Sequence, residues 1–217
     1  MNNMEKIENH KGVTWDLKSR ISNFEFRAYD FTGTNFNSAM FENVSFNDCV
    51  FDKSILSGTK IFYDSNFSKC AFRNVDLSNT MVGSHKGVYE DCSFDRCSFK
   101  GKEFNYTRFI SCLFNKCKLK SINFNASSFY KCKFIGSMDD LTFNGIYDSN
   151  KSEFKILDIV DFFDVEFGEF VSFINCDLSS CIPPKGKEFN QLLYNLYAND
   201  PSFLSTGSKD KIVLARK

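Results

Sequence analysis

Residues 92–99 read CSFDRCSF, so a cysteine followed two positions later by a phenylalanine occurs twice at a spacing of five residues. Five residues match neither the 3.6-residue period of an α-helix nor the two-residue alternation of one long strand. The spacing continues on both sides of this stretch, with one inserted residue before Phe67 and a two-residue shift at 83–87. The large apolar residues at this spacing are Phe26, Phe31, Phe36, Phe41, Phe46, Phe51, Leu56, Ile61, Phe67, Phe72, Leu77, Val82, Tyr89, Phe94, Phe99, Phe104, Phe109, Phe114, Leu119, Phe124, Phe129 and Phe134.

A smaller residue, usually Cys, Ser, Thr, Ala or Val, stands two positions before most of these large residues, and Lys102 is the conspicuous exception. The positions between and after them carry Asn, Asp, Ser, Lys and Arg. Each unit therefore has two inward residues around one outward residue, as in a very short strand, followed by a turn. We expect a core made of Phe94, Phe99, Phe104, Phe109, Phe114, Leu119, Phe124, Phe129, Phe134, Cys92, Cys97, Cys112, Cys117 and Cys132.

This pattern resembles the pentapeptide-repeat family, whose unit places a small residue two positions before a central Leu or Phe. The resemblance extends over about residues 24–182 and is most specific over 26–134. It implies an all-β fold, a right-handed quadrilateral β-helix with four units, or 20 residues, in each coil. The 20-residue spacing of Cys92, Cys112 and Cys132 agrees with such a coil. Residues 1–23 are then a lead-in that covers one end, and 183–217 form a C-terminal helix and tail.

The nine cysteines could indicate zinc or disulfides, but their placement favours packing. Eight of them stand two positions before a large apolar residue, where a small side chain has to fill a narrow corner, and reduced cysteine behaves as a small buried apolar residue. Structural zinc motifs use two to four intervening residues with a second matched pair. We therefore predict no metal, no disulfide and no cofactor.

Three irregular segments follow the regular repeats. Residues 136–154 are predicted to form a loop or an irregular coil, and small-then-large pairs return at Val160 and Phe162. Pro183 and Pro184 should end the ladder, because proline cannot donate a hydrogen bond to it. Residues 187–197 have apolar residues at helical spacing, which predicts a helix that caps the open end or forms a dimer contact. Because the family often dimerises through its C-terminal region, we expect a homodimer, with 211–215 (KIVLA) as a final strand across the interface. The candidate dimer contacts are Phe189, Leu192, Leu193, Leu196 and Tyr197.

Charge is distributed in blocks although the formal net charge is zero. Residues 94–137 contain nine Lys or Arg against two acidic residues, net +7, whereas residues 138–170 contain nine acidic residues against two Lys, net −7. Solvated outward positions account for much of this, yet such a rod would orient a charged partner. The candidate partner contacts are Asp158, Asp161, Asp164 and Glu166. Zero net charge gives no general argument for direct nucleic-acid binding.

No catalytic site is expected. No zinc-protease, phosphate-loop, dinucleotide or nucleophile-elbow motif occurs, and Ser84 beside His85 lacks a third residue to orient it. No apolar run is long enough for a membrane span, and without a signal peptide we expect a cytoplasmic protein.

The resemblance implies a non-enzymatic protein that binds other proteins. One subgroup of the family protects DNA gyrase, a type II topoisomerase, from quinolones or peptide toxins by resembling DNA. The length, the breaks at 83–87 and 138–151, and the Phe- and Cys-rich units look like that subgroup. The basic central coils depart from it, because a mimic of DNA should be acidic along the face that it presents. The alternative is a general scaffold, such as an immunity, regulatory or effector module with an unrelated partner.

Overall fold

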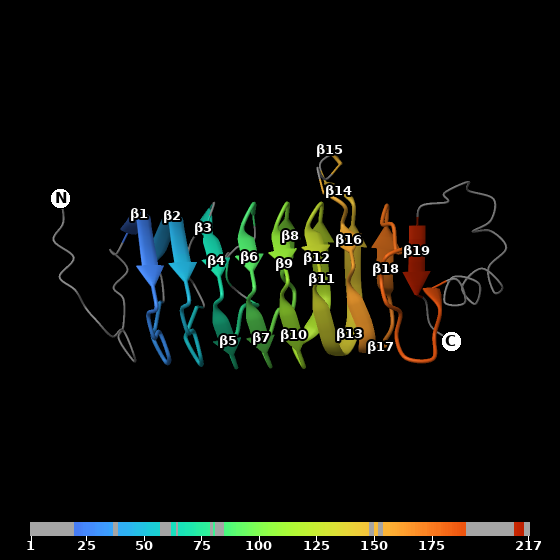
Figure 1. Ribbon diagram of the computed structural model, residues 1–217, viewed down its shortest axis with the longest axis horizontal. Coiled ribbons are helices and arrows are strands. Elements are labelled where there is room, and N and C mark those ends of the chain that lie inside the picture. Colours follow the sequence, from blue (N-terminus) through green and yellow to red (C-terminus); the bar gives the residue numbers. More distant parts are fainter. Residues whose placement is uncertain are drawn as a thin grey trace.

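The chain winds into a β-solenoid in which short strands from successive coils lie side by side (Figure 1). The computed structural model describes residues 20–36, 39–56, 62–63, 65–78, 80, 85–147, 150–151, 154–189 and 211–214. Every strand pair between successive coils is parallel. Each coil has four sides, which we number as faces one to four in chain order.

The first face is the most continuous row of strands, and it contains seven strands, so the chain completes six turns between β1 and β16. These strands are β1 (Arg20–Arg27), β2 (Met40–Asn47), β4 (Asn66–Ser68), β6 (Val88–Glu90), β9 (Arg108–Ile110), β12 (Ser128–Tyr130) and β16 (Leu157–Asp158). The longer strands β1 and β2 begin on the fourth face, where β2 also pairs with β3 (Phe62–Tyr63).

The remaining strands form the other faces. The second face contains β5 (Ala71–Arg73), β7 (Ser93–Asp95), β10 (Leu113–Asn115) and the starts of β13 (Lys133–Asn144) and β17 (Asp161–Phe167). The fourth face contains β8 (Glu103–Asn105), the ends of β11 (Leu119–Asn125) and β13, and β18 (Val171–Ile174). On the third face, successive coils are paired through single-residue bridges and through the long strands β11, β13 and β17. The short hairpin of β14 (Ile146–Tyr147) and β15 (Asn150–Lys151) projects from the edge of the solenoid (Figure 1).

A left-handed residue at most of the described corners explains why the repeat has five residues. At these corners the residue two positions after the central apolar residue has positive φ, as in Arg96 (53°), Ser111 (51°) and Lys116 (51°). At three corners this residue is a glycine, which adopts the conformation without steric cost: Gly33, Gly101 and Gly136. The chain therefore makes three residues of strand and a sharp turn in each unit, and four such turns close one coil.

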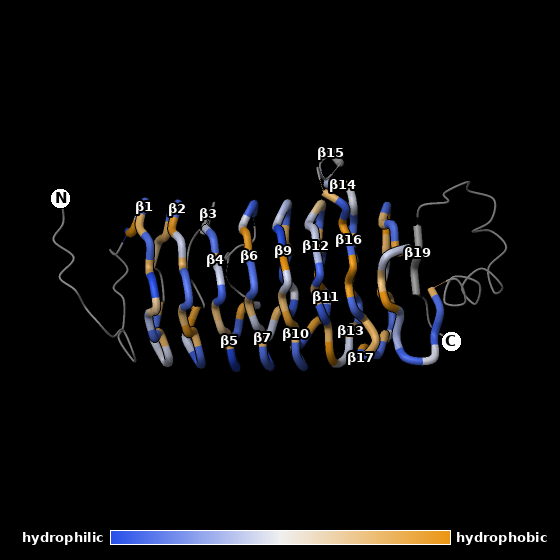
Figure 2. The backbone as a smooth tube through the Cα atoms, viewed as in Figure 1, coloured by the Kyte–Doolittle hydropathy of each residue, from blue (hydrophilic) through white to orange (hydrophobic). Residues whose placement is uncertain are grey.

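The predicted core is confirmed. All fourteen predicted core residues are buried, and none is more than 6% exposed. Rings of successive coils stack at the same face: Phe94 lies 5.0 Å from Phe114, and Phe114 lies 4.6 Å from Phe134, with interplanar angles of 14° and 12°. These stacks agree with a 20-residue coil in this region. Figure 2 shows the resulting alternation of hydrophobic and hydrophilic positions along each coil.

Two details of the predicted register are wrong. Phe62, and not Ile61, lies opposite Phe41, so the inserted residue precedes the fourth face rather than following it. Residues 136–144 are not a loop, because β13 continues through them and buries Leu141 and Phe143. Phe143 pairs with Phe124 at a separation of 19 residues instead of 20, and this one-residue deletion hid the repeat.

At the C-terminal end the Ile182 carbonyl accepts a hydrogen bond of 2.9 Å from the Phe162 amide, and one further bond of 3.0 Å, from the Lys185 amide to the Phe163 carbonyl, follows Pro183 and Pro184. The predicted strand near the C-terminus is present as β19 (Lys211–Leu214), and it pairs antiparallel with β18 of the same chain. The predicted helix over 187–197 falls almost entirely outside the described residues. Within the described part of the chain, no helix has the length and apolar character needed to span a bilayer.

Candidate functional site

Both interruptions of the repeat adjoin the corner of the solenoid between the fourth and first faces: the first precedes His85, at the end of the fourth face, and the second follows Asn144. The first interruption returns to the ladder at His85, which bridges to Asn105, and the second begins after Asn144, whose carbonyl accepts a hydrogen bond from the Ala126 amide. Two regular corners, at Tyr106 and Ala126, lie between them. Segments about 60 residues apart in the sequence are therefore brought to one edge.

Tyr106 connects the two interruptions directly. Its hydroxyl donates a hydrogen bond of 2.9 Å to the carbonyl of Tyr147 in the projecting hairpin, and the two rings lie 5.6 Å apart. On its other side the ring meets that of His85 edge-on at 6.0 Å. We call the group formed by His85, Tyr106, Arg108, Tyr147 and Phe154 the aromatic corner.

Arg108 and Phe154 complete the aromatic corner. The Arg108 guanidinium carbon lies 4.0 Å from the centre of the Phe154 ring, a cation–π contact that holds both side chains in place. Phe154 remains 45% exposed, although it is large and apolar. Tyrosine and arginine are enriched among the residues that dominate binding energy at protein interfaces, and phenylalanine is enriched in interface cores. The composition of this corner therefore matches that of many protein interfaces.

Sequence analysis identified the two breaks but did not identify the aromatic corner. Tyr106 stands at an ordinary outward position of a regular unit, so nothing in the pattern marks it. The available signal was that both breaks end just before a first-face unit, at Tyr89 and at Leu157. In repeat proteins, insertions at the same place in different repeats map to one edge, which is often the binding edge.

The four predicted acidic contacts do not form one acidic face. They occupy a single coil, with Asp158 on the first face, Asp161 on the second, Asp164 at the end of the second face opposite Ile135, and Glu166 on the third. Three of the four are in ion pairs. Lys133 Nζ lies 3.2 Å from Asp161 and 2.9 Å from Asp164, and Lys155 Nζ lies 3.4 Å from Asp158. The solenoid places the acidic block beside the basic one, so the charges partly neutralise each other.

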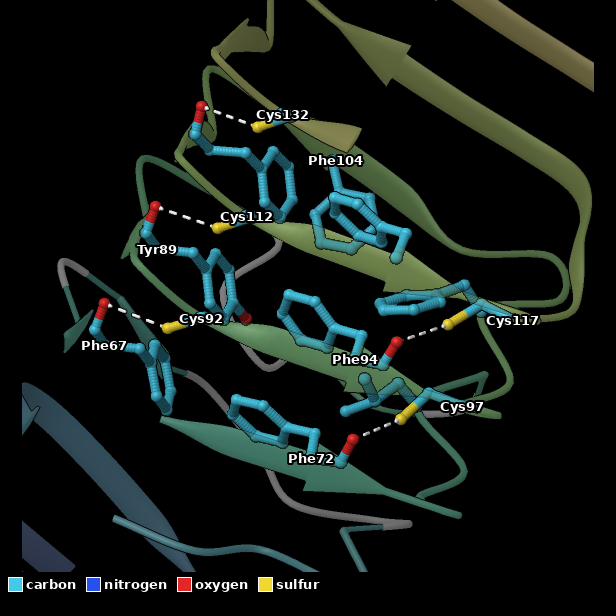
Figure 3. Packing of buried hydrophobic residues seen from close by; sticks show 14 of the residues in the cluster. Phe67, Phe72, Tyr89, Cys92, Phe94, Cys97, Phe104, Cys112, Cys117 and Cys132 are labelled. Atoms are coloured by element: carbon cyan, nitrogen blue, oxygen red, sulfur yellow. Dashed lines mark hydrogen bonds between the residues drawn. The ribbon is translucent and has the colours of Figure 1, made fainter. Parts of the chain in front are cut away.

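The cysteines form columns inside the solenoid. Cys49, Cys70, Cys92, Cys112 and Cys132 occupy the same inner corner of five successive coils, and Cys97 and Cys117 occupy the next one. Each thiol donates to a backbone carbonyl of the preceding coil, as Cys92 does to Phe67 and Cys117 to Phe94, at 3.4 and 3.3 Å (Figure 3). All nine cysteines are free, and no group of residues suited to hold a metal ion occurs among the described residues.

The environment of these thiols disfavours the reactive thiolate. Burial raises the pKa of Cys92 and of Cys112. A hydrogen bond with the neighbouring thiol of Cys70, followed by burial, raises the pKa of Cys49. Because the thiolate is the nucleophile and the metal ligand, the raised pKa values favour a packing role for these three thiols.

We therefore expect the seven buried thiols to stay unreactive in the native protein. Ellman's reagent at mildly alkaline pH should label at most the two half-buried cysteines, Cys176 and Cys181, within minutes. After unfolding in guanidinium chloride all nine should react, which serves as the control. Rapid labelling of the buried columns in the native state, or stoichiometric zinc in the purified protein, would contradict this interpretation.

Lys102, the exception in the sequence pattern, is buried with 3% exposure. Its ammonium group donates a hydrogen bond of 2.7 Å to the Thr80 carbonyl, at the start of the first interruption, and lies 4.9 Å from the centre of the Phe104 ring. Burial lowers the pKa of this lysine from 10.5 to about 7. Other inner residues of the same column in later coils are apolar: Ile122, Leu141 and Val171. The lysine thus occupies a place that an apolar residue fills elsewhere.

Of the five predicted dimer contacts, only Phe189 lies in the described part of the chain, and Leu192, Leu193, Leu196 and Tyr197 lie outside it. Phe189 is partly buried and closes the end of the core, with its ring 6.1 Å from Phe162 and 6.0 Å from Phe173. This contact is the capping role that the sequence predicted for the segment.

Comparisons with known proteins agree with the repeat. The family described as pentapeptide repeats (8 copies) matches residues 30–62. Full-length QnrB1, described as a plasmid-mediated fluoroquinolone resistance protein, is similar at 15% sequence identity, covering 88% of this chain and 95% of QnrB1, with a TM-score of 0.30. HetL from the cyanobacterium Nostoc sp. strain PCC 7120, a pentapeptide-repeat protein involved in heterocyst differentiation regulation, is similar at 11% identity, covering 81% of this chain and 84% of HetL, with a TM-score of 0.26. No curated protein matches the sequence.

The five-residue period, the left-handed corners and the four-sided coil are properties of this chain itself. The family match falls on the same units, over residues 30–62. Together they show that the solenoid is built from repeats of the pentapeptide type.

Proposed function

We propose that this protein is a non-enzymatic scaffold that binds a protein partner through the aromatic corner. The observation that carries the proposal is that residues beside both interruptions meet at one edge, where Tyr106 contacts His85 and Tyr147. A rigid solenoid positions loops precisely, and loops on a rigid scaffold commonly carry binding residues. The contact between Arg108 and Phe154 leaves an exposed, ordered phenylalanine, which is the kind of anchor that a partner's pocket can take up.

The more specific partner that we propose is a bacterial type II DNA topoisomerase, gyrase or topoisomerase IV, protected from quinolones or peptide toxins in the cytoplasm. The resemblance of the repeat units and of their two interruptions to the topoisomerase-protecting subgroup supports this partner. Binding by mimicry of DNA would require a continuous acidic face. Along the first face of the described residues, exposed carboxylates such as Glu90 alternate with cations such as Arg108. The aromatic corner is therefore the contact that we favour.

An alternative contact is the acidic coil that contains Asp158, Asp161, Asp164 and Glu166. A C-terminal homodimer would place two copies of this coil near the dimer centre, facing a cationic groove of the enzyme. Reversing the charges of Asp158, Asp161 and Glu166 would then abolish protection. A second alternative is a general scaffold with an unrelated partner, which would use the same aromatic corner.

Two matched variants distinguish the contacts. Phe154→Ala removes the exposed ring of the aromatic corner, and Phe163→Ala removes a ring of similar exposure, 44% against 45%, beside the acidic coil. In a gyrase supercoiling assay with a quinolone present, we expect the wild-type protein to restore supercoiling. We expect Phe154→Ala to require at least about tenfold more protein, in line with the loss of one interface anchor, and Phe163→Ala to behave like the wild type.

Three outcomes are informative. Loss of protection with Phe163→Ala alone would move the contact to the acidic coil. If the wild-type protein gives no protection of gyrase or topoisomerase IV, the topoisomerase is not the partner. In that case a pulldown from host lysate with wild type and Phe154→Ala tests the scaffold directly, and a partner retained equally by both proteins would overturn the aromatic corner as the binding surface.

A further inference from the structure

The third face of the solenoid and its two corners change charge sign abruptly along the rod. One half carries only cations at its strongly exposed positions, and we call it the basic half: Arg96, Lys100, Lys116 and Lys118. The adjoining half carries carboxylates, and we call it the acidic half: Asp139, Asp140, Asp164, Glu166 and Glu169. Together the two halves form the charged strip.

The boundary between the halves is defined by strand register. Lys120 of β11 pairs directly with Asp139 of β13, and their side chains form an ion pair of 2.6 Å. Before this boundary Ser98 bridges to Lys118, and beyond it Ser137 pairs with Glu166. The charge therefore reverses between two neighbouring coils of one flat face.

One carboxylate borders the basic half: Asp76 bridges to Ser98 on the same face and interacts electrostatically with Lys118, so the charge of the basic half is only partly compensated. Its four side chains are exposed, and none of them forms an ion pair with another described residue. Residues at equivalent positions of successive coils are about 4.8 Å apart, the spacing of neighbouring strands. Like charges at that distance repel each other, so an anionic partner on this half lowers the electrostatic energy.

The neighbouring acidic half restricts what that partner can be. An extended polyanion such as a nucleic acid would be attracted to the basic half and repelled by the acidic half. A partner that satisfies both must itself carry adjacent halves of opposite sign, at the same spacing. The charged strip of a second copy has this property, because both solenoids share the same strand spacing.

We propose that the charged strip binds a second copy of this chain, side by side and antiparallel. A two-fold axis lying in the contact plane, at the boundary between Lys120 and Asp139, exchanges the two halves. The coil that carries Arg96 and Lys100 then faces the coil that carries Asp164 and Glu166 in the other copy. Each such contact occurs twice, as a two-fold interface requires.

The association is mainly electrostatic, because the exposed residues of the strip are charged, serine or glycine, apart from Phe170 at the corner after the third face, which is 50% exposed. Exposed ion pairs contribute little individually and are screened by salt, so the association should weaken strongly as ionic strength rises. This behaviour separates it from a C-terminal dimer held by apolar residues, which salt would not weaken. The proposal does not depend on the identity of the protein partner.

The test is sedimentation velocity of the full chain at about 100 μM, in about 0.1 M salt and in about 1 M salt. The Debye length, over which exposed charges interact, is about 10 Å in the lower salt and about 3 Å in the higher. We expect a dimer in the lower salt and dissociation in the higher. The variant Arg96→Glu with Lys100→Glu reverses the charge of the coil that faces Asp164 and Glu166 of the other copy, and Asp164→Lys with Glu166→Lys reverses the charge of that facing coil. Each should be monomeric alone, and an equimolar mixture should form a heterodimer, because the mixture restores both opposite-sign contacts.

A control variant carries the same number of charge reversals elsewhere: Lys69→Glu with Lys131→Glu, two exposed lysines at the corner between the first and second faces. It should associate like the wild type, and circular dichroism should show all variants folded. Three results would each overturn the proposal: a wild-type monomer in the lower salt, a folded charge-reversed variant of the strip that still dimerises alone, or an equimolar mixture of the two variants that stays monomeric. Binding of a fluorescent oligonucleotide by a monomeric wild type would assign the basic half to a polyanion instead.

Discussion

Replacing Phe114 by alanine should lower the free energy of unfolding by about 3–5 kcal/mol, the range for large-to-small changes in a packed core. Phe114 is 1% exposed and is stacked between Phe94 and Phe134 in the coils before and after its own. The backbone ladder holds these coils at a fixed separation, so the cavity left by the ring cannot collapse. The expected loss is therefore near the upper part of the range.

Equilibrium denaturation in guanidinium chloride measures this loss as a shift of the transition midpoint. Leu113→Ala is the matched control, because Leu113 is the adjacent residue on the outward side of the same strand and is 37% exposed. Its substitution should cost less than about 1 kcal/mol, as surface changes usually do. If both variants lost the same stability, stacking of Phe114 inside the coil would not be the main contribution at this site.

Replacing Lys102 by methionine should stabilise the protein at neutral pH and below, with a gain that falls as the pH rises. Burial lowers the pKa of Lys102 from 10.5 to about 7. The unfolded chain therefore binds one more proton than the folded chain between these values, and wild-type stability rises with pH across this window. The cost of the buried charge is present in full below pH 7 and is lost above 10.5. At about 1.36 kcal/mol per pKa unit, its upper limit is about 5 kcal/mol.

The hydrogen bond to Thr80 and the contact with Phe104 offset part of that cost, so we expect a gain of about 1–4 kcal/mol at about pH 6, as in other replacements of buried charges by apolar residues. Unfolding curves at about pH 6 and about pH 9.5 give the pH dependence. Lys100→Met, which removes an exposed lysine two residues away, should show no such dependence. A destabilised Lys102→Met protein at both pH values would show that the lysine contributes a net favourable contact.

The fold was predictable because its determinants are local and repeated. A small residue, an outward residue, a large apolar residue and a left-handed corner recur in each unit, so Phe94, Phe114 and Phe134 could be placed on one face from their 20-residue spacing alone. Cys92 and Cys112 were likewise assigned to packing because they occupy the small inner position. The prediction failed where the number of residues in a coil changed, as at Phe62 and Phe143. The sequence does not show at which corner a single residue has been inserted or deleted.

The sequence by itself determined the solenoid and its core, since burial of one apolar residue in every five leaves few other ways to pair the strands. Only the tertiary structure decided which outward residues share an edge. Tyr106 meets Tyr147 because coils stack residues about 20 positions apart, and the lengths of the interruptions shift that alignment. The same stacking set Lys133 against Asp161 and Asp164. Blocks of opposite charge that are separate in the sequence thus became neighbours, because contacts between coils, unlike those within a unit, depend on every insertion that lies between them.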